Sequence, residues 1–379
     1  MAEWQFQDIR PSRKGECQMS VQNTQPADKA NPYYVILSID GGGIRGLIPA
    51  TVLVQLEKLI QAKRGDKGKI GDYFHFVAGT STGGILASLY LCPDQNDRTK
   101  ARFSAQDAVN FYKDNGDRIF DVSLWQQIRS AKGLRDEKYS AKALETVLKQ
   151  NVGDLELKDL IKPCLITGYD MRLSRPTFFT QQDADDPTQN YRVRDVMRAT
   201  SAAPTYFEPA MPETLDGIKN ETPVVDGGVF ANNPTACAIV EAMVKGYGVK
   251  NGIVNGVPLE KIVVLSLGTG RKPKTYSYQE CKDWGLVSWV RPLLDILMEG
   301  VSQTVDYQMI QLFKSAKRDT QYLRVDGEFG DYKNRLDIPN LNQSMDCATK
   351  ENMDRLITFG QQVAQNNSKQ LNDFVQAYF

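Results

Sequence analysis

The chain has 379 residues, of which 41% are hydrophobic and 24% are charged. This length is enough for a large buried core in one or two domains, and the composition is that of an ordinary globular protein. Its 46 basic and 46 acidic residues balance. Charge therefore gives no reason to expect a nucleic-acid polymer or an anionic membrane as a partner.

The first 31 residues are polar and unpatterned. They hold no apolar run of the kind that a secretory signal peptide needs, so we expect a flexible arm over residues 1–31 and a cytoplasmic protein. The six cysteines are far apart and form no C-x-x-C pair, so we expect free thiols in a reducing compartment. With one histidine, His75, and no H-E-x-x-H motif, the sequence predicts no metal or other cofactor.

From residue 33 the sequence alternates between strand and helix patterns. It predicts strands at Val35–Ile39, Tyr73–Ala78, Pro163–Tyr169, Pro223–Val225 and Ile262–Leu267. Helices are predicted at Pro49–Gln61 and Gly83–Leu91, and another begins at Asn233-Pro234, where asparagine is a good cap and proline a good first residue. Strand-then-helix alternation predicts an α/β fold with a mainly parallel central sheet flanked by helices.

No internal repeat and no convincing linker divides the chain after the N-terminal arm. We expect one main domain over residues 32–270 and a mostly helical C-terminal part over residues 271–379, packed on the same domain. The longest charge-free run of note, Phe76 to Cys92, has Gly-Thr-Ser-Thr-Gly-Gly in its middle. Strand, turn and helix explain this run better than a membrane span does.

A glycine-rich turn, Asp40-Gly-Gly-Gly-Ile-Arg-Gly46, follows the first strand and leads into the first helix. Backbone N–H groups in such a turn favour negative charge, either a nucleotide pyrophosphate or an oxyanion that exists only during a reaction. Gly41, Gly43 and Gly46 satisfy G-x-G-x-x-G, but the second strand does not end in the acid that a dinucleotide site needs. A P-loop is also disfavoured, because no Gly-Lys-Ser/Thr follows the glycines.

The second motif is Gly79-Thr-Ser81-Thr-Gly83, which lies between a predicted strand and a predicted helix. A tight turn in this position exposes the serine Oγ, and the small flanking residues permit its strained geometry. G-x-S-x-G by itself is a weak pattern that also fits a glycine-rich turn with an incidental serine. The strand–turn–helix context favours Ser81 as a nucleophile.

A nucleophilic serine needs a general base. His75 precedes Ser81 by six residues on the incoming strand, which puts it roughly 15–20 Å away, whereas proton transfer needs about 3 Å. Asp226 is the other candidate, because it ends a buried-type strand and is followed by Gly227 and Gly228, which allow close approach of backbone or substrate. Alone, this Asp-Gly pair fits an ordinary turn better.

All three motifs follow predicted strands. Since the carboxyl ends of parallel strands share one edge of a sheet, we expect the glycine turn, Ser81 and Asp226 to meet there. The amides of Gly41, Gly42 and Gly43 would then hold the oxyanion of an ester-hydrolysis intermediate, where each good donor lowers the barrier by about 3–4 kcal/mol. An isolated aspartate is a weak base, so we expect burial or a neighbouring group to raise the pKa of Asp226.

Four segments, in this order and spacing, make the sequence resemble the patatin-like phospholipase family: Ser38 to Gly46, Tyr73 to Ala87, Arg198 to Ala210 and Val224 to Pro234. The resemblance runs from about Val35 to Gly270. It implies a lipid acyl hydrolase with a Ser–Asp dyad, independent of metal ions, on a parallel-sheet α/β fold. One departure is His75, where family members often have an acid.

Residue roles follow from the same resemblance by motif position. It makes Ser81 the nucleophile, Asp226 the base and Gly41, Gly42 and Gly43 the oxyanion loop, accompanied by Arg45. The remaining motif glycines are Gly46, Gly79, Gly83, Gly227 and Gly228.

Beyond Gly270 the notable segment is 284–300, where apolar residues cover most of a predicted helix. Arg291, Asp295 and Glu299 form one narrow polar stripe on it. Such a helix is usually buried, and its stripe is not basic, so packing in the core or in an oligomer is favoured over a lid or a membrane-docking role. The region also resembles bacterial patatin-like effectors that cyclic dinucleotides activate in antiphage defence, although no nucleotide-binding motif supports this.

Together, these patterns predict a cytoplasmic serine esterase that hydrolyses membrane phospholipids and contacts the inner face of the membrane when active. A cyclic-nucleotide activator and a homo-oligomer are further expected partners. The alternative, from another class, is a patatin-fold binding or scaffolding protein without turnover. The presence of both Ser81 and Asp226 argues against that alternative.

Overall fold

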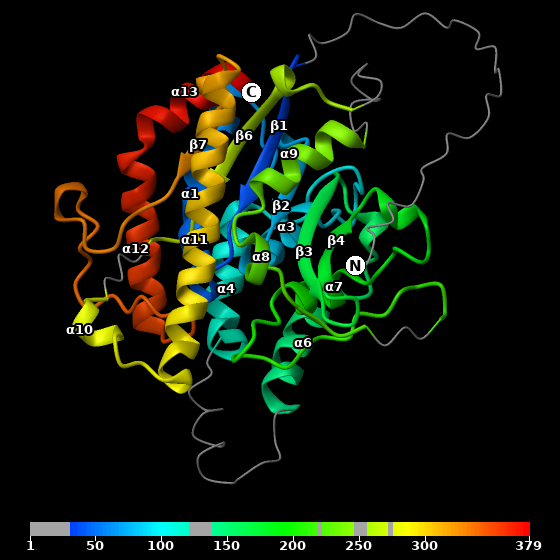
Figure 1. The fold of residues 1–379 in the computed structure, drawn as a ribbon. Helices are drawn as coiled ribbons and strands as arrows, with labels where there is room; N and C mark the ends of the chain where they lie inside the picture. The colour runs from blue at the N-terminus through cyan, green and yellow to red at the C-terminus, as the bar shows by residue number, and fades with distance from the viewer. Residues whose placement is uncertain (1–30, 121–137, 219–221, 246–255, 272–275) are drawn as a thin grey trace, which may run out of the picture. The chain divides into compact units, whose positions relative to one another are not determined.

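The computed structural model describes residues 31–120, 138–218, 222–245, 256–271 and 276–379. Cys17 and the expected N-terminal arm lie outside these ranges. The described part is built on a seven-stranded sheet (Figure 1) with the order β4-β3-β2-β1-β6-β7, and β5 pairs with β3. The strands are β1 (Tyr34–Ile39), β2 (Phe76–Gly79), β3 (Cys164–Asp170), β4 (Arg175–Thr180), β5 (Val224–Asp226), β6 (Ile262–Leu267) and β7 (Tyr322–Val325).

Most neighbouring strands run parallel. β3, β2, β1, β6 and β7 form a continuous parallel series, whereas β4 and β5 run antiparallel to β3. The predicted α/β fold with a mainly parallel sheet is therefore confirmed. The expectation that Asp226 ends a parallel strand is wrong, because β5 runs back along β3 and places Asp226 opposite Gly168. A strand of three residues carries no sign of its direction in the sequence.

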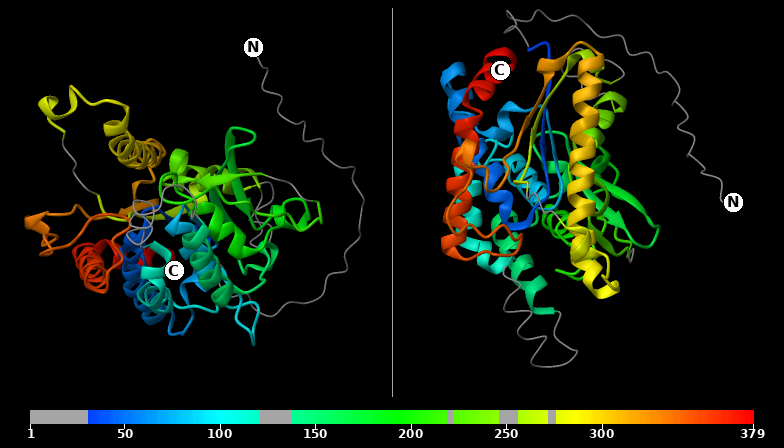
Figure 2. Two further views of the ribbon diagram at one scale, coloured as in Figure 1. Left: turned by 90° about the horizontal axis from the view of Figure 1, so that it is seen from below. Right: turned by 60° about the vertical axis from the view of Figure 1, so that its left-hand side comes forward.

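Helices cover both faces of the sheet (Figure 2). Alternate residues of a strand point to opposite faces, so a buried strand such as β1 contributes to the packing on both. Val35, Leu37 and Ile39 of β1 pack in the larger core, while Tyr34 and Ile36 pack in a smaller one. The larger core includes α1 (Leu47–Arg64), α3 (Thr82–Leu91), α4 (Ala105–Phe120), α6 (Lys138–Val152), α7 (Val193–Thr200), α12 (Lys350–Asn366) and α13 (Ser368–Tyr378). The smaller core includes α9 (Thr235–Val244) and α11 (Leu286–Ser315). Short helices in the connections are η1 (Gly43–Gly46), α2 (Ile70–Tyr73), α8 (Gly228–Ala231) and α10 (Tyr278–Cys281).

Several predicted boundaries differ from the structure by one to three residues, and two of the differences have a local cause. The second strand begins at Phe76 rather than Tyr73, because residues 70–73 form α2. The Asp72 carboxylate accepts the Lys69 N–H (2.9 Å) and so caps this helical turn. Helix α9 begins at Thr235, whose N–H donates to Oδ1 of Asn233 (3.0 Å).

The C-terminal part contributes to the sheet as well as to the helices. β7 extends the sheet beyond β6, and α12 packs along α1 (Figure 1). The sequence predicted the helices of this part but not β7, which has four residues. The C-terminal part therefore supplies the outermost strand of the parallel series, next to β6.

Candidate active site

Ser81 lies in a sharp turn between β2 and α3. Its backbone has φ 55° and ψ −123°, a strained conformation that a non-glycine residue keeps only when its surroundings hold it. A Cβ on Gly79 would lie 2.1 Å from the Gly83 carbonyl oxygen, and one on Gly83 would lie 2.1 Å from that of Ile39. Both flanking positions therefore require glycine. Ser81 is also the N-cap residue of α3, where the helix favours developing negative charge.

The glycine turn lies against this serine. An added Cβ on Gly41 would come within 3.2 Å of the Ser81 Cβ. The Gly41 N–H already donates to the carbonyl oxygen of Asn232 (3.0 Å), so its geometry does not fit the oxyanion role expected for it. Within the described residues, the N–H groups of Gly42 and Gly43 donate no hydrogen bond to the protein. They are therefore the candidate oxyanion donors.

Arg45 orients the same turn. Its Nε and its backbone N–H both donate to the Gly42 carbonyl oxygen, at 3.5 and 3.2 Å, and its Nη1 donates to that of Gly270 (3.3 Å). In a planar trans peptide, a carbonyl held on one side turns the following N–H, here that of Gly43, to the other side. Gly43 has φ 60°, and a Cβ there would lie 2.2 Å from the Met345 carbonyl oxygen. Substitution at Gly43 would therefore displace the turn.

Gly46 closes the turn against the start of α3. A Cβ on Gly46 would lie 2.2 Å from Oγ1 of Thr82, the residue after the serine. The glycine turn and the serine turn are thus packed directly on each other, so a shift in one moves the other.

Asp226 is buried at the end of β5. The Gly228 N–H donates to its Oδ1 (2.7 Å), whereas its Oδ2 has no hydrogen-bond partner among the described residues. Burial raises the pKa of Asp226 to about 7, and the nearby Ser81 hydroxyl and the Gly228 N–H offset only part of this rise. The carboxyl group can therefore exchange a proton near neutral pH, as a general base must. Gly227 is required for space, because a Cβ there would lie 2.0 Å from Oγ1 of Thr167.

A cavity of about 850 Å³ opens over Ser81 and Asp226. Gly42, Gly43 and Arg45 form part of its wall. Helix α11 supplies another part, with the side chains of Ile296, Leu297, Met298, Ser302, Gln303 and Ile310. A cavity of this volume accommodates a ligand of several tens of atoms, and the apolar part of its mixed lining suits a hydrocarbon chain.

Residues 37–239 match the family model described as patatin-like phospholipase. The chain belongs to the patatin-like phospholipase family. It is 34% identical over 369 residues to patatin-like protein 1 of Oryza sativa subsp. indica, covering 92% of this chain and 85% of that protein. It is 33% identical over 378 residues to patatin-like protein 1 of Arabidopsis thaliana, covering 93% and 87%. The structure of VipD from Legionella pneumophila matches 87% of this chain and 67% of its own, with 12% identity and a TM-score of 0.35.

As a patatin-like phospholipase, the chain is a serine hydrolase. The segment from Arg198 to Ala210 contacts both expected functional residues, Ser81 and Asp226. Oγ1 of Thr200 accepts the Ser81 N–H (2.9 Å), and the Ala202 carbonyl oxygen accepts the Asp226 N–H (3.0 Å). The sequence analysis used the segment from Arg198 to Ala210 only for the resemblance. In the structure, this segment sets the separation between Ser81 and Asp226.

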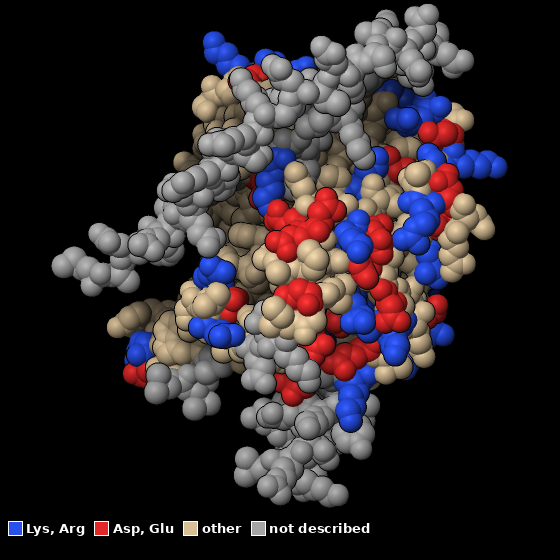
Figure 3. Space-filling model, turned by 90° about the vertical axis from the view of Figure 1, so that its right-hand side faces the viewer, with Lys and Arg blue, Asp and Glu red and all other residues tan. Residues whose placement is uncertain are grey.

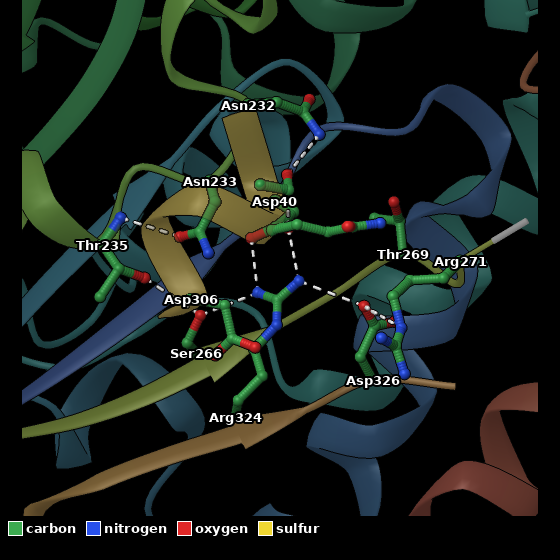
Figure 4. A network of polar contacts seen from close by, with 12 residues as sticks. Asp40, Asn232, Asn233, Thr235, Ser266, Thr269, Arg271, Asp306, Arg324 and Asp326 are labelled. Carbon is green, nitrogen blue, oxygen red and sulfur yellow. Dashed lines mark hydrogen bonds and ion pairs between the residues drawn. The ribbon is translucent and has the colours of Figure 1, made fainter. Parts of the chain in front are cut away.

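A cation from the far end of the chain holds the acid of the glycine turn. Asp40 is buried, and Nη1 and Nη2 of Arg324 on β7 donate to its two carboxylate oxygens at 2.9 and 2.7 Å (Figure 4). Arg324 also pairs with Asp326 (3.2 Å). Burial raises the pKa of Asp40 to about 6 although Arg324 opposes the rise, so the pair is charged at neutral pH. No motif of the sequence pointed to Arg324.

Helix α11 joins the same network through Ser302. Its Oγ donates to Oδ2 of Asp40 (3.3 Å) and accepts a hydrogen bond from Nδ2 of Asn232 (3.0 Å). Asn232 in turn accepts the Gly41 N–H through its carbonyl oxygen. The glycine turn of this patatin-like site is thus held by β7, by α11 and by the residue that follows α8.

His75 lies in the connection just before β2, away from the cavity lining. Its Nδ1 accepts the Val35 N–H (3.0 Å) near the start of β1, and its ring lies 5.2 Å from that of Tyr34. Burial lowers the pKa of His75 to about 4, so the ring is neutral at physiological pH. These contacts give His75 a structural role, which leaves Asp226 as the candidate base.

The described residues hold no cluster of the kind that binds a metal ion, since none of their His, Cys, Asp and Glu side chains gather in threes that could hold one. The cysteines that can be described, Cys92, Cys164, Cys237, Cys281 and Cys347, are free. No helix in the described ranges is long and apolar enough to cross a membrane.

Proposed function

We propose that the chain hydrolyses acyl esters of membrane phospholipids through a Ser81–Asp226 dyad. The observation that carries this proposal is that a strained serine turn and a buried aspartate with a pKa of about 7 line one cavity. Residues 32–270 act as the catalytic domain, and residues 271–379 pack on it as an extension. The substrate class follows from the family and is supported by the apolar part of the cavity wall.

The reaction has two halves. Asp226 takes the proton of the Ser81 hydroxyl while Oγ attacks the ester carbonyl carbon, and the N–H groups of Gly42 and Gly43 stabilise the oxyanion. The leaving lysolipid oxygen takes the proton from Asp226, which leaves an acyl group on Ser81. Asp226 then takes a proton from water, which attacks the acyl carbon, and the return of that proton to Ser81 releases the fatty acid.

The test is hydrolysis of a soluble fluorogenic ester by the full chain. Ser81→Ala and Asp226→Asn should each lower kcat by at least about a thousandfold, because both groups act in the covalent steps. Ser88→Ala on α3 and Asp170→Asn on β3 are matched controls, since both change buried polar residues outside the cavity lining. Turnover by a folded Ser81→Ala protein close to that of the unsubstituted chain would contradict the proposed nucleophile.

The competing function is a binding or scaffolding protein without turnover. A folded, unsubstituted chain that neither hydrolyses the ester nor reacts with a fluorophosphonate at Ser81 would favour this alternative. The pKa of about 7 for Asp226 argues against it, since a buried acid near neutrality is typical of a site that moves protons.

Control of the activity is a separate part of the proposal. We place the enzyme in the cytoplasm, at the inner face of the membrane when active, and as a homo-oligomer. A cyclic-nucleotide activator gains no support from the plant patatin-like relatives reported above. It is tested by adding a panel of cyclic di- and trinucleotides to the ester assay, and full activity without them would leave a constitutive lipid acyl hydrolase.

A further inference from the structure

The N-terminal half of α11 leaves large apolar side chains in water. Trp289, Leu293, Ile296 and Leu297 are 39–46% exposed, so these residues do not pack in the core of the chain, and packing in an oligomer stays a prediction. The spacing of Trp289, Leu293 and Ile296 places them on one face of the helix. An exposed apolar face of this kind marks an interaction site.

This face leads into the cavity over Ser81. Continuing at the same spacing of three and four residues, it reaches Gln303, Tyr307 and Ile310, which line the cavity together with Ile296. An apolar strip, interrupted by Gly300 and Gln303, therefore runs from the N-terminal end of α11 to the cavity over Ser81. Figures 1 and 2 show α10 and the first turns of α11 standing away from the sheet.

Aromatic rings extend this strip at its outer end. The rings of Tyr276 and Trp284 lie 4.9 Å apart, and those of Trp284 and Trp289 lie 5.1 Å apart, both edge to face. Tyr278 on α10 is largely exposed beside them in the chain. Tyrosine and tryptophan have an apolar body and a polar tip, and they are enriched where a protein meets the boundary between lipid and water.

Charge restricts what can cover the strip. Segment 276–300 has two basic residues, Lys282 and Arg291, and four acidic ones, Glu280, Asp283, Asp295 and Glu299. It therefore lacks the basic cluster that attracts anionic headgroups. On the face seen in Figure 3, acidic and basic side chains are mixed without an extended basic patch. Apolar insertion is therefore the way in which this segment would reach a lipid surface.

We propose that residues 276–297, the α10–α11 arm, insert their aromatic and apolar side chains into the surface of a phospholipid bilayer. This contact sets the mouth of the Ser81 cavity against the lipid, so an acyl chain can move along α11 from the bilayer to the serine without entering water. The inference rests on the proposed function, and it names the surface through which that function reaches its substrate.

The test compares an arm variant with a matched variant elsewhere. Trp289→Ser/Leu293→Ser changes two exposed residues that do not line the cavity. Val240→Ser/Val244→Ser changes two exposed residues of α9, which packs on β1 and β2 through its buried side and lies outside the α10–α11 arm. Both proteins should hydrolyse a soluble ester as the unsubstituted chain does, which also shows that they fold.

Vesicles of phosphatidylcholine with and without phosphatidylglycerol give the decisive measurement. The arm variant should lose about tenfold or more in vesicle binding, measured in a Ser81→Ala background, and a similar factor in vesicle hydrolysis. The α9 variant should lose neither. Binding should change little with phosphatidylglycerol content or with salt, and binding that disappears at high salt would overturn apolar insertion.

Two further outcomes keep this inference separate from the proposed function. If the unsubstituted chain does not hydrolyse the soluble ester, the proposed function fails, whatever the vesicles show. If it does, but the arm variant binds vesicles normally, the inference fails alone. An arm variant that dissociates an oligomer without changing vesicle binding would show that a second copy covers the strip, which also overturns the proposal.

Bromine-labelled phosphatidylcholine should quench tryptophan emission in the unsubstituted arm, and absence of quenching counts against insertion.

Discussion

The glycine-lined side of the cavity and its α11 side differ in how tightly they are packed. At Gly43, Gly79 and Gly83, an added methyl group would lie 2.1–2.2 Å from a backbone oxygen. At Gly300 on α11, the same methyl group would meet nothing within 4 Å. The first region holds a strained serine backbone and a buried ion pair, while the second leaves leucine and isoleucine half exposed.

This difference separates two requirements of lipid hydrolysis. Transition-state stabilisation needs donors that are already in place, so the backbone around Ser81 must be fixed by its neighbours. Access for an apolar substrate needs surface that the protein itself does not cover. The cavity meets both requirements, because one wall is made of close-packed backbone and the other includes apolar side chains that are half exposed.

The largest effect is expected from adding a single methyl group to the tight side. Gly83→Ala would push against the Ile39 carbonyl oxygen and displace the serine turn, so kcat should fall by at least about a hundredfold. Gly300→Ala is the control from the other region and should keep kcat while stabilising the protein by about 0.5–1 kcal/mol. Ester hydrolysis and thermal unfolding measure both. Equal losses of activity at the two glycines would contradict the contrast in packing.

The next effect concerns the buried ion pair behind the glycine turn. Arg324→Gln leaves the Asp40 carboxylate buried without its cation, which should cost about 3–5 kcal/mol of stability and lower kcat through the displaced turn. Arg271→Gln removes a cation that is half exposed and 3.9 Å from Asp326, so it should cost less than about 1 kcal/mol. Urea unfolding compares the two. Restoration of stability by Asp40→Asn in the Arg324→Gln background would support the pairing.

A smaller and graded effect is expected from pH. Since the pKa of Asp226 is about 7 in the folded chain, kcat/KM should fall about tenfold for each pH unit below that value, as the base becomes protonated. The same raised pKa means that the folded state holds its proton over a range where the unfolded state has released it. Asp226 therefore makes stability decrease as pH rises from about 4 to about 7, and Asp226→Asn should remove this contribution while that of Asp40, whose pKa is raised to about 6, stays.

His75→Gln is the control for this profile. The pKa of His75 is about 4, so its titration does not account for a limb near pH 7, and the substitution should leave that limb in place. If a stable His75→Gln protein lost this limb, the assignment of Asp226 as the base would be wrong.

The smallest expected effect is that of metal removal. The proposed mechanism uses only side-chain and backbone groups. EDTA should therefore change the turnover of a soluble ester by less than about twofold. Strong inhibition that calcium or zinc reverses would contradict the dyad mechanism.

Local patterns in the sequence predicted most of the parallel sheet and the turn around Ser81. Each strand-to-helix turn is set by residues within about five positions of one another, and such turns are visible in a single sequence. The antiparallel direction of β5 was missed, because its three residues acquire a direction only by pairing with β3.

Long-range partners were also missed. Arg324 lies 284 residues from Asp40 and belongs to no motif. The loss of Gly41 as an oxyanion donor depends on the carbonyl group of Asn232, which sequence spacing does not reveal. A helix that is apolar on most sides fits a core as well as it fits an exposed arm, so the solvent exposure of α11 required the fold.

The pairing of Asp40 with Arg324 has a consequence for protein synthesis. A ribosome makes the glycine turn, the serine turn and Asp226 long before it reaches β7. Until Arg324 has been synthesised, the Asp40 carboxylate has no cation to pair with when it is buried. The turn that carries Gly42 and Gly43 then lacks this ion pair. A chain cut short before β7 would carry every recognisable motif and yet be expected to lack activity, so the cell meets a competent lipase only when translation is nearly complete.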